Sequence, residues 1–92
     1  MKDTRIEKII NHFGINHQLI KLAEECSELT QAALKYRDKS LLDNSTDLYE
    51  NLVEEIADVE ILIAQIKSRI INENQIKEKI EYKLNRTLER IS

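Results

Sequence analysis

Apolar residues recur at spacings of three and four along most of the chain, which is the period of an amphipathic helix. Residues 3–12 predict a short first helix that ends near Gly14, the single glycine of the chain. A second helix is expected from Ile15 to about Arg37. Its predicted apolar seam consists of Leu19, Leu22, Cys26, Leu29, Ala33 and Tyr36.

The segment from Asp38 to Asp47 breaks this period and predicts the main loop, because its Ser, Thr, Asn and Asp side chains compete for backbone hydrogen bonds. Asp47 and Glu50 have the spacing of a capping box, which opens a third helix. Further apolar residues widen this helix's surface beyond one stripe and predict a subunit interface. Its expected seam is Leu52, Ile56, Val59, Ile63, Ile66 and Ile70.

A fourth helix is predicted after Asn72, which has capping spacing with Gln75. Its apolar residues are Ile76, Ile80, Leu84, Leu88 and Ile91. We therefore expect an all-α fold, with one domain over residues 1–92 and about four helices, of which two long ones run antiparallel. A chain of 92 residues buries a limited share of its surface alone, so we expect oligomerisation to complete the bundle.

Composition narrows the classes of partner. The net charge is −3, with 14 basic and 17 acidic residues, which disfavours binding to duplex nucleic acid. The N-terminus has no apolar signal core, and no run approaches the ~18 apolar residues of a membrane span, so a cytoplasmic protein without membrane contact is expected. Cys26 has no second cysteine to pair with, and its place in the predicted seam indicates a small buried hydrophobic residue.

Two acidic clusters carry the candidate chemistry, Glu24-Glu25-x-x-Glu28 and Glu55-x-x-Asp58. Carboxylates three residues apart share one face of a helix, so each cluster can direct two ligands to one point. Each pair begins one position before a predicted seam residue, so both pairs should occupy the same shoulder of their helices. If the two helices pack antiparallel, the clusters face each other.

Four carboxylates in a partly dry cleft repel one another, and either protonation or a bound cation relieves the repulsion. Oxygen-only ligation suits Mg²⁺, or Mn²⁺, which would also accept phosphate oxygens. The structural alternative is a solvated charged helix face. A di-iron site would need Glu-x-x-His pairs, and neither His12 nor His17 follows a glutamate by three. Zinc is disfavoured because His and Cys ligands are scarce.

These clusters resemble the signature of the MazG-like all-α nucleotide pyrophosphohydrolases, Glu-Glu-x-x-Glu, a spacer and Glu-x-x-Asp, over roughly residues 12–66. The resemblance implies hydrolysis of a nucleoside triphosphate between its α and β phosphates, giving a monophosphate and pyrophosphate. It implies Mg²⁺ ligation by Glu25, Glu28, Glu55 and Asp58. Glu24 would orient or deprotonate the attacking water, and Glu28 is the other candidate for this base.

The resemblance also suggests contacts to the substrate. Lys21 lies one turn before Glu25 and is either a phosphate contact or the partner of a salt bridge. Lys83 and Arg86 resemble a basic C-terminal stretch that contacts phosphates in relatives, with a solvated helix face as the alternative. Base and sugar contacts in the family often come from the first helices, which makes Gln18 and His17 candidates. Single-module relatives associate as dimers or tetramers, so a homodimer or homotetramer is expected.

A second class of function is a non-catalytic helical bundle that assembles with a partner or senses nucleotide. The acidic residues favour the enzyme, since a scaffold has no need to place carboxylates on matching shoulders against their repulsion.

Overall fold

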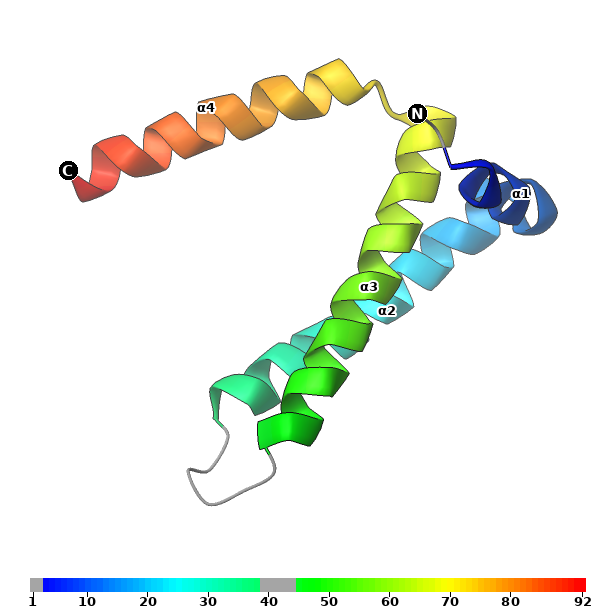
Figure 1. Ribbon diagram of the computed structural model, residues 1–92. Coiled ribbons are helices and arrows are strands. Elements are labelled where there is room, and N and C mark those ends of the chain that lie inside the picture. The colour runs from blue at the N-terminus through cyan, green and yellow to red at the C-terminus, as the bar shows by residue number, and fades with distance from the viewer. Residues whose placement is uncertain (1–2, 39–44) are drawn as a thin grey trace.

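The computed structural model describes residues 3–38 and 45–92, and within these residues the chain forms four helices and no strand (Figure 1). The helices are α1 (Thr4–Phe13), α2 (Ile15–Arg37), α3 (Ser45–Ile70) and α4 (Glu73–Ile91). The all-α prediction is therefore confirmed. None of the described helices is long and apolar enough to cross a membrane.

The helix ends follow the residues that predicted them. Asp3 caps α1 through its side chain, which accepts a hydrogen bond from the backbone N–H of Arg5 at 3.0 Å. Gly14 ends α1 with a φ of 87°, a conformation that side-chain-bearing residues rarely adopt, and its N–H donates to the Ile10 carbonyl. Asn72 caps α4 by accepting from the Asn74 N–H.

The start of α3 differs from the prediction. The helix begins at Ser45, so Asp47 lies within its first turn rather than before it. A carboxylate there still stabilises the helix, because it faces the positive end of the helix dipole. Residues 39–44 of the predicted loop lie outside the described part of the chain.

α2 and α3 pack side by side along most of their lengths and run antiparallel (Figure 1). The side chains of Gln18 and Gln65 form a hydrogen bond near one end of the pair. Near the other end, the ring centroids of Tyr36 and Tyr49 lie 6.3 Å apart. α1 packs across the Gln65 end of the pair, where Arg69 of α3 donates a hydrogen bond to Asn11. Within residues 3–38 and 45–92, few apolar side chains are buried: Ile10, Ala32, Val59, Leu62 and Ile66.

The contact between α2 and α3 confirms half of the predicted seam, namely Leu22, Leu29, Tyr36, Leu52, Val59 and Ile66, whereas the other predicted seam residues are exposed. We define the seam as the buried and half-buried residues Gln18, Leu22, Glu25, Leu29, Ala32 and Tyr36 of α2 with Leu52, Glu55, Val59, Leu62 and Ile66 of α3. Glu25 and Glu55 therefore lie in the seam, and the prediction that they sit one position beside it was wrong. Cys26 is exposed, so its predicted burial was also wrong.

Two faces flank this seam. Successive helix residues are 100° apart, so the residues before and after a seam position lie on opposite sides. Apolar residues that follow seam positions form the apolar face, which contains Leu19, Cys26, Ala33, Val53, Ile56 and Ile63; the polar residues Thr30, Arg37, Glu60 and Lys67 lie on the same side. Polar, exposed residues that precede seam positions form the polar face, which contains His17, Lys21, Glu24, Glu28, Glu54 and Asp58; Ile61 lies on the same side, and Gln65 also precedes a seam residue but is buried. Antiparallel helices are related by a local twofold axis across the pair, so each face combines residues from both.

α4 leads away from the end of α3 and packs along none of the other helices (Figure 1). None of its residues is fully buried. The turn between α3 and α4 is held by the Asn72 cap and by an ion pair of 3.4 Å between Lys67 and Glu73. Its apolar side chains are accordingly exposed: Ile80, Tyr82, Leu84, Leu88 and Ile91.

Candidate metal centre

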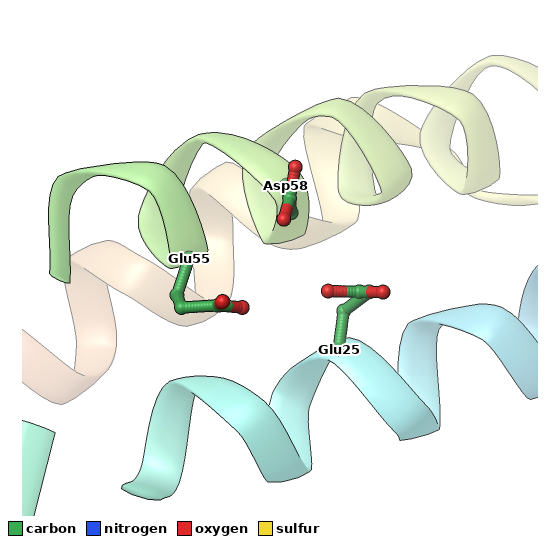
Figure 2. Close-up of side chains that lie close together, drawn as sticks. All are labelled: Glu25, Glu55 and Asp58. Atoms are coloured by element: carbon green, nitrogen blue, oxygen red, sulfur yellow. The ribbon is translucent and has the colours of Figure 1, made fainter. Parts of the chain in front are cut away.

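Three carboxylates from two helices converge in the seam. Glu25 reaches from α2 toward Glu55 and Asp58 of α3 (Figure 2). One oxygen from each lies within 4.8 Å of the other two. Glu55 and Asp58 are three apart and share one side of α3, while the antiparallel packing brings Glu25 opposite them.

The surroundings of Glu55 make this cluster electrostatically unfavourable. Its Oε2 is buried, and no donor in the described part of the chain reaches it. Burial raises the pKa of Glu55 above its usual value, and the negative charges of Asp58, Glu25, Glu28 and Glu54 raise it further. A buried oxygen without a hydrogen-bond partner is costly. The cluster therefore favours a cation or a proton.

The structure brings together three of the four predicted ligands. Glu28 lies outside the group of three, although its charge acts on Glu55. It is exposed on the polar face, as is Glu24. The two predicted candidates for the base therefore flank the cluster from α2.

A pocket of about 350 Å³ adjoins the cluster on the polar face. Lys21 lies in it, and its Nζ makes an ion pair of 3.3 Å with Glu25 Oε1. The sequence allowed Lys21 to be either a phosphate contact or the partner of a salt bridge, and the structure contains the salt bridge. Its positive charge partly balances the negative charge of the carboxylates. The lining residues are Gln18, Lys21, Glu25, Asp58, Ile61 and Leu62.

Gln18 is buried, and it forms a polar network with a residue that the sequence did not single out. Its Nε2 donates a hydrogen bond of 2.8 Å to Oε1 of Gln65, which is 1% exposed. His17 Nδ1 lies 2.7 Å from Gln18 Oε1, and the His17 ring stacks on Phe13 with centroids 4.9 Å apart. The signal for Gln65 was present: a glutamine between Leu62 and Ile66, at the edge of an apolar stripe.

Lys83 and Arg86 lie on α4, which does not pack on the helices that carry the carboxylates. The Arg86 guanidinium lies 5.5 Å from the centre of the Tyr82 ring, one turn earlier on the same helix. The structure thus brings Gln18 and Lys21 to the pocket beside the cluster, while Lys83 and Arg86 occupy a separate element.

The geometry fits a hard divalent cation. All three donors are carboxylate oxygens, and the exposed Asp58 leaves one side open to water or phosphate oxygens. In comparisons with known proteins, no family model, no curated protein and no solved structure matches this chain. The functional assignment therefore rests on the acidic motif and on the arrangement of its side chains.

Proposed function

We propose that this protein is a Mg²⁺-dependent nucleotide pyrophosphohydrolase, which cleaves nucleoside triphosphates between the α and β phosphates. One observation carries the proposal: carboxylate oxygens of Glu25, Glu55 and Asp58 converge within 4.8 Å across the seam between two helices. Such convergence favours a bound cation or a proton, since Lys21 balances only part of the negative charge. The acidic motif from which these residues come resembles that of the MazG-like pyrophosphohydrolases.

Glu25, Glu55 and Asp58 would hold Mg²⁺, or Mn²⁺, and Glu28, whose charge acts on Glu55, would be the fourth predicted ligand. The unpartnered Oε2 of Glu55 fits this role, because a ligand oxygen needs no hydrogen-bond donor. When bound, the ion neutralises charge on the phosphate oxygens and lowers the pKa of bound water. Zinc and iron fit less well, since no histidine belongs to the cluster.

Carboxylates on the polar face would accept the proton that the attacking water loses. Water attacks the α-phosphorus, its oxygen forms the new P–O bond, and the bond from that phosphorus to the bridging oxygen breaks. Pyrophosphate leaves with the bridging oxygen, and Glu24 or Glu28 takes the proton from the water. Lys21 lies at the pocket beside Glu25, where a triphosphate can share its charge.

The triphosphate also requires cations beyond Lys21, and Lys83 and Arg86 are our candidates. We further propose that the chain works as a homodimer or homotetramer. The apolar face supports this assembly, because it combines exposed apolar side chains from both α2 and α3, among them Ile56 and Ile63, and lies opposite the polar face. A second copy on that face leaves the pocket open to substrate.

The direct test is to incubate the protein with Mg²⁺ and a panel of canonical and modified nucleoside triphosphates, and to measure pyrophosphate release. Release of pyrophosphate with one or more of them, lost on chelation of the metal, is expected. No turnover of any nucleotide, together with no effect of Mg²⁺ on the melting temperature, would contradict the enzymatic proposal.

The same experiment distinguishes the proposed enzyme from a second candidate function. The exposed apolar residues on α3 and α4 also favour a non-catalytic module that assembles with other chains or senses nucleotide. Such a module would bind nucleotide without releasing pyrophosphate, or would not bind it. Its assembly would be insensitive to substitutions in the acidic cluster.

A further inference from the structure

A buried pair of glutamines joins α2 to α3 beside the pocket. Gln18 is 4% exposed and Gln65 is 1% exposed, and their side chains share a hydrogen bond of 2.8 Å. Polar side chains are rarely buried without a partner, because a buried donor or acceptor that lacks one carries the full cost of its desolvation. In a chain with so few buried residues, this pair occupies space that apolar side chains would fill at lower cost.

In the structure, the Gln18 amide is oriented with its Nε2 toward Gln65. Gln65 Oε1 accepts from Gln18 Nε2, so the Gln18 Oε1 points to the other side, where His17 Nδ1 lies 2.7 Å away. An amide oxygen can only accept, so the neutral His17 ring must carry its proton on Nδ1. The other ring nitrogen, Nε2, is then a hydrogen-bond acceptor. Stacking on Phe13 holds the ring in place.

These groups lie at the end of the polar face away from the carboxylates. His17, Lys21 and Glu25 are four residues apart along α2, so they share one side of the helix and span about 12 Å. The pocket runs between the two ends, with Gln18 at one and Glu25 and Asp58 at the other. A nucleotide whose phosphates lie at the carboxylates would place its nucleoside toward Gln18; His17 precedes Gln18 on α2 and does not itself line the pocket.

We propose that Gln65 is a positioning residue, which through Gln18 fixes the proton of His17 on Nδ1 and so presents an acceptor, Nε2, to a nucleoside N–H or O–H group. This proposal rests on the proposed function for the identity of the ligand. The side-chain arrangement itself does not depend on it. The donor could be a sugar hydroxyl or an amino or imino group of the base.

The test compares Gln65→Met, which keeps the volume and removes the acceptor, with Gln65→Glu, which keeps an acceptor oxygen. Leu62→Met is the matched control, since Leu62 lines the same pocket from the same helix without a polar contact. Nitrogen-15 NMR of the His17 ring at pH 8 reports which nitrogen is protonated. The protein should show the proton on Nδ1, and Gln65→Met should shift it toward Nε2, whereas Leu62→Met should leave it unchanged.

Kinetics give the second measurement. Loss of one hydrogen bond should raise KM about tenfold in Gln65→Met, with kcat changed by less than about twofold. Gln65→Glu should restore much of the loss. Deoxy- and dideoxynucleotides separate a sugar donor from a base donor, because only the sugar donor disappears with the hydroxyls.

Several results would overturn the proposal. One is a proton on Nε2 of His17 in the unaltered protein. Another is a Gln65→Met variant that melts at a lower temperature but keeps its tautomer and KM, which would make the pair a purely structural lock between helices. If the unaltered protein turns over no nucleotide, the proposed function fails, while the NMR comparison still decides whether Gln65 positions His17.

Discussion

The seam between α2 and α3 and the apolar face beside it contrast in a way that is opposite to expectation. The seam includes two carboxylates and a glutamine, Glu25, Glu55 and Gln18, whereas the apolar face exposes residues such as Ile56 and Ile63. Burial of apolar groups is the main source of stability, and burial of charge opposes it. This arrangement supports our proposals that the carboxylates of the seam bind a metal ion and that a second copy covers the apolar face.

The largest effect is expected at the acidic cluster, where Asp58 on the polar face meets Glu25 and Glu55 of the seam. Asp58→Asn removes one charged ligand while keeping shape, so turnover should fall by roughly 100-fold. Helical content and assembly should remain unchanged, as measured by circular dichroism and light scattering. Glu60→Gln is the matched control, because Glu60 is exposed on α3 and lies outside the cluster. Equal loss of turnover in both variants, or no loss in either, would contradict a special role for the acidic cluster.

A substitution on the apolar face should change association rather than turnover. Ile63→Glu places a charge where a second copy packs, and we expect it to weaken association by about 2 kcal/mol or more. Light scattering at micromolar concentration should then show a smaller species. Ile20→Glu is the control, since Ile20 is 65% exposed on α2 and belongs to neither face. A monomer in the unaltered protein would contradict the proposed assembly.

A substitution at Glu55 should show that repulsion between the carboxylates destabilises the contact between α2 and α3. Glu55→Gln removes the carboxylate whose pKa is raised by burial and by its acidic neighbours. Without divalent cations, the melting temperature should therefore rise, measured by differential scanning calorimetry. The stabilisation that Mg²⁺ gives the unaltered protein should disappear in the variant. A lower melting temperature in the variant would mean that Glu55 supports the fold.

The smallest effect is expected at α1, away from both faces. The side-chain hydrogen bond from Arg5 lowers the pKa of Asp3 to about 2, from a usual value of 3.8. A lowered folded-state pKa contributes stability that is present above pH 3.8 and is lost as the pH falls through about 2. The stability difference between the unaltered protein and Asp3→Asn should shrink over this range in acid-unfolding experiments. A difference that stays constant would show that the ion pair is not formed.

Helix boundaries were largely predictable because they depend on local residues. Gly14 and Asn72 end and begin helices through their own conformations and hydrogen bonds, so the sequence near each was sufficient. With Asp47 as its cap, α3 was predicted to start three residues after Ser45, because a carboxylate suits both the cap and the first turn. The path of α4 was not predictable, since no pattern within that helix specifies what it packs against.

Hydrophobicity alone could not predict which residues of α3 face α2, and the reason is physical. The predicted α3 stripe shares Leu52, Val59 and Ile66 with the seam but takes Ile56 and Ile63 where the seam has Glu55 and Leu62. A choice by hydrophobicity prefers an isoleucine to the glutamate before it, and so moves part of the stripe onto the apolar face. The same error placed Cys26 inside. The acidic motif still identified Glu25, Glu55 and Asp58, because its spacing depends on chemistry rather than on burial.

The central claim is that the carboxylates of the seam bind a divalent cation. Mn²⁺ can stand in for Mg²⁺, and electron paramagnetic resonance measures how much of it is bound, with and without a non-hydrolysable nucleoside triphosphate. We predict saturable binding to the unaltered protein and to Glu60→Gln, and loss of that binding in Glu55→Gln. Equal binding by Glu55→Gln, or no saturable binding by the unaltered protein under either condition, would contradict the account.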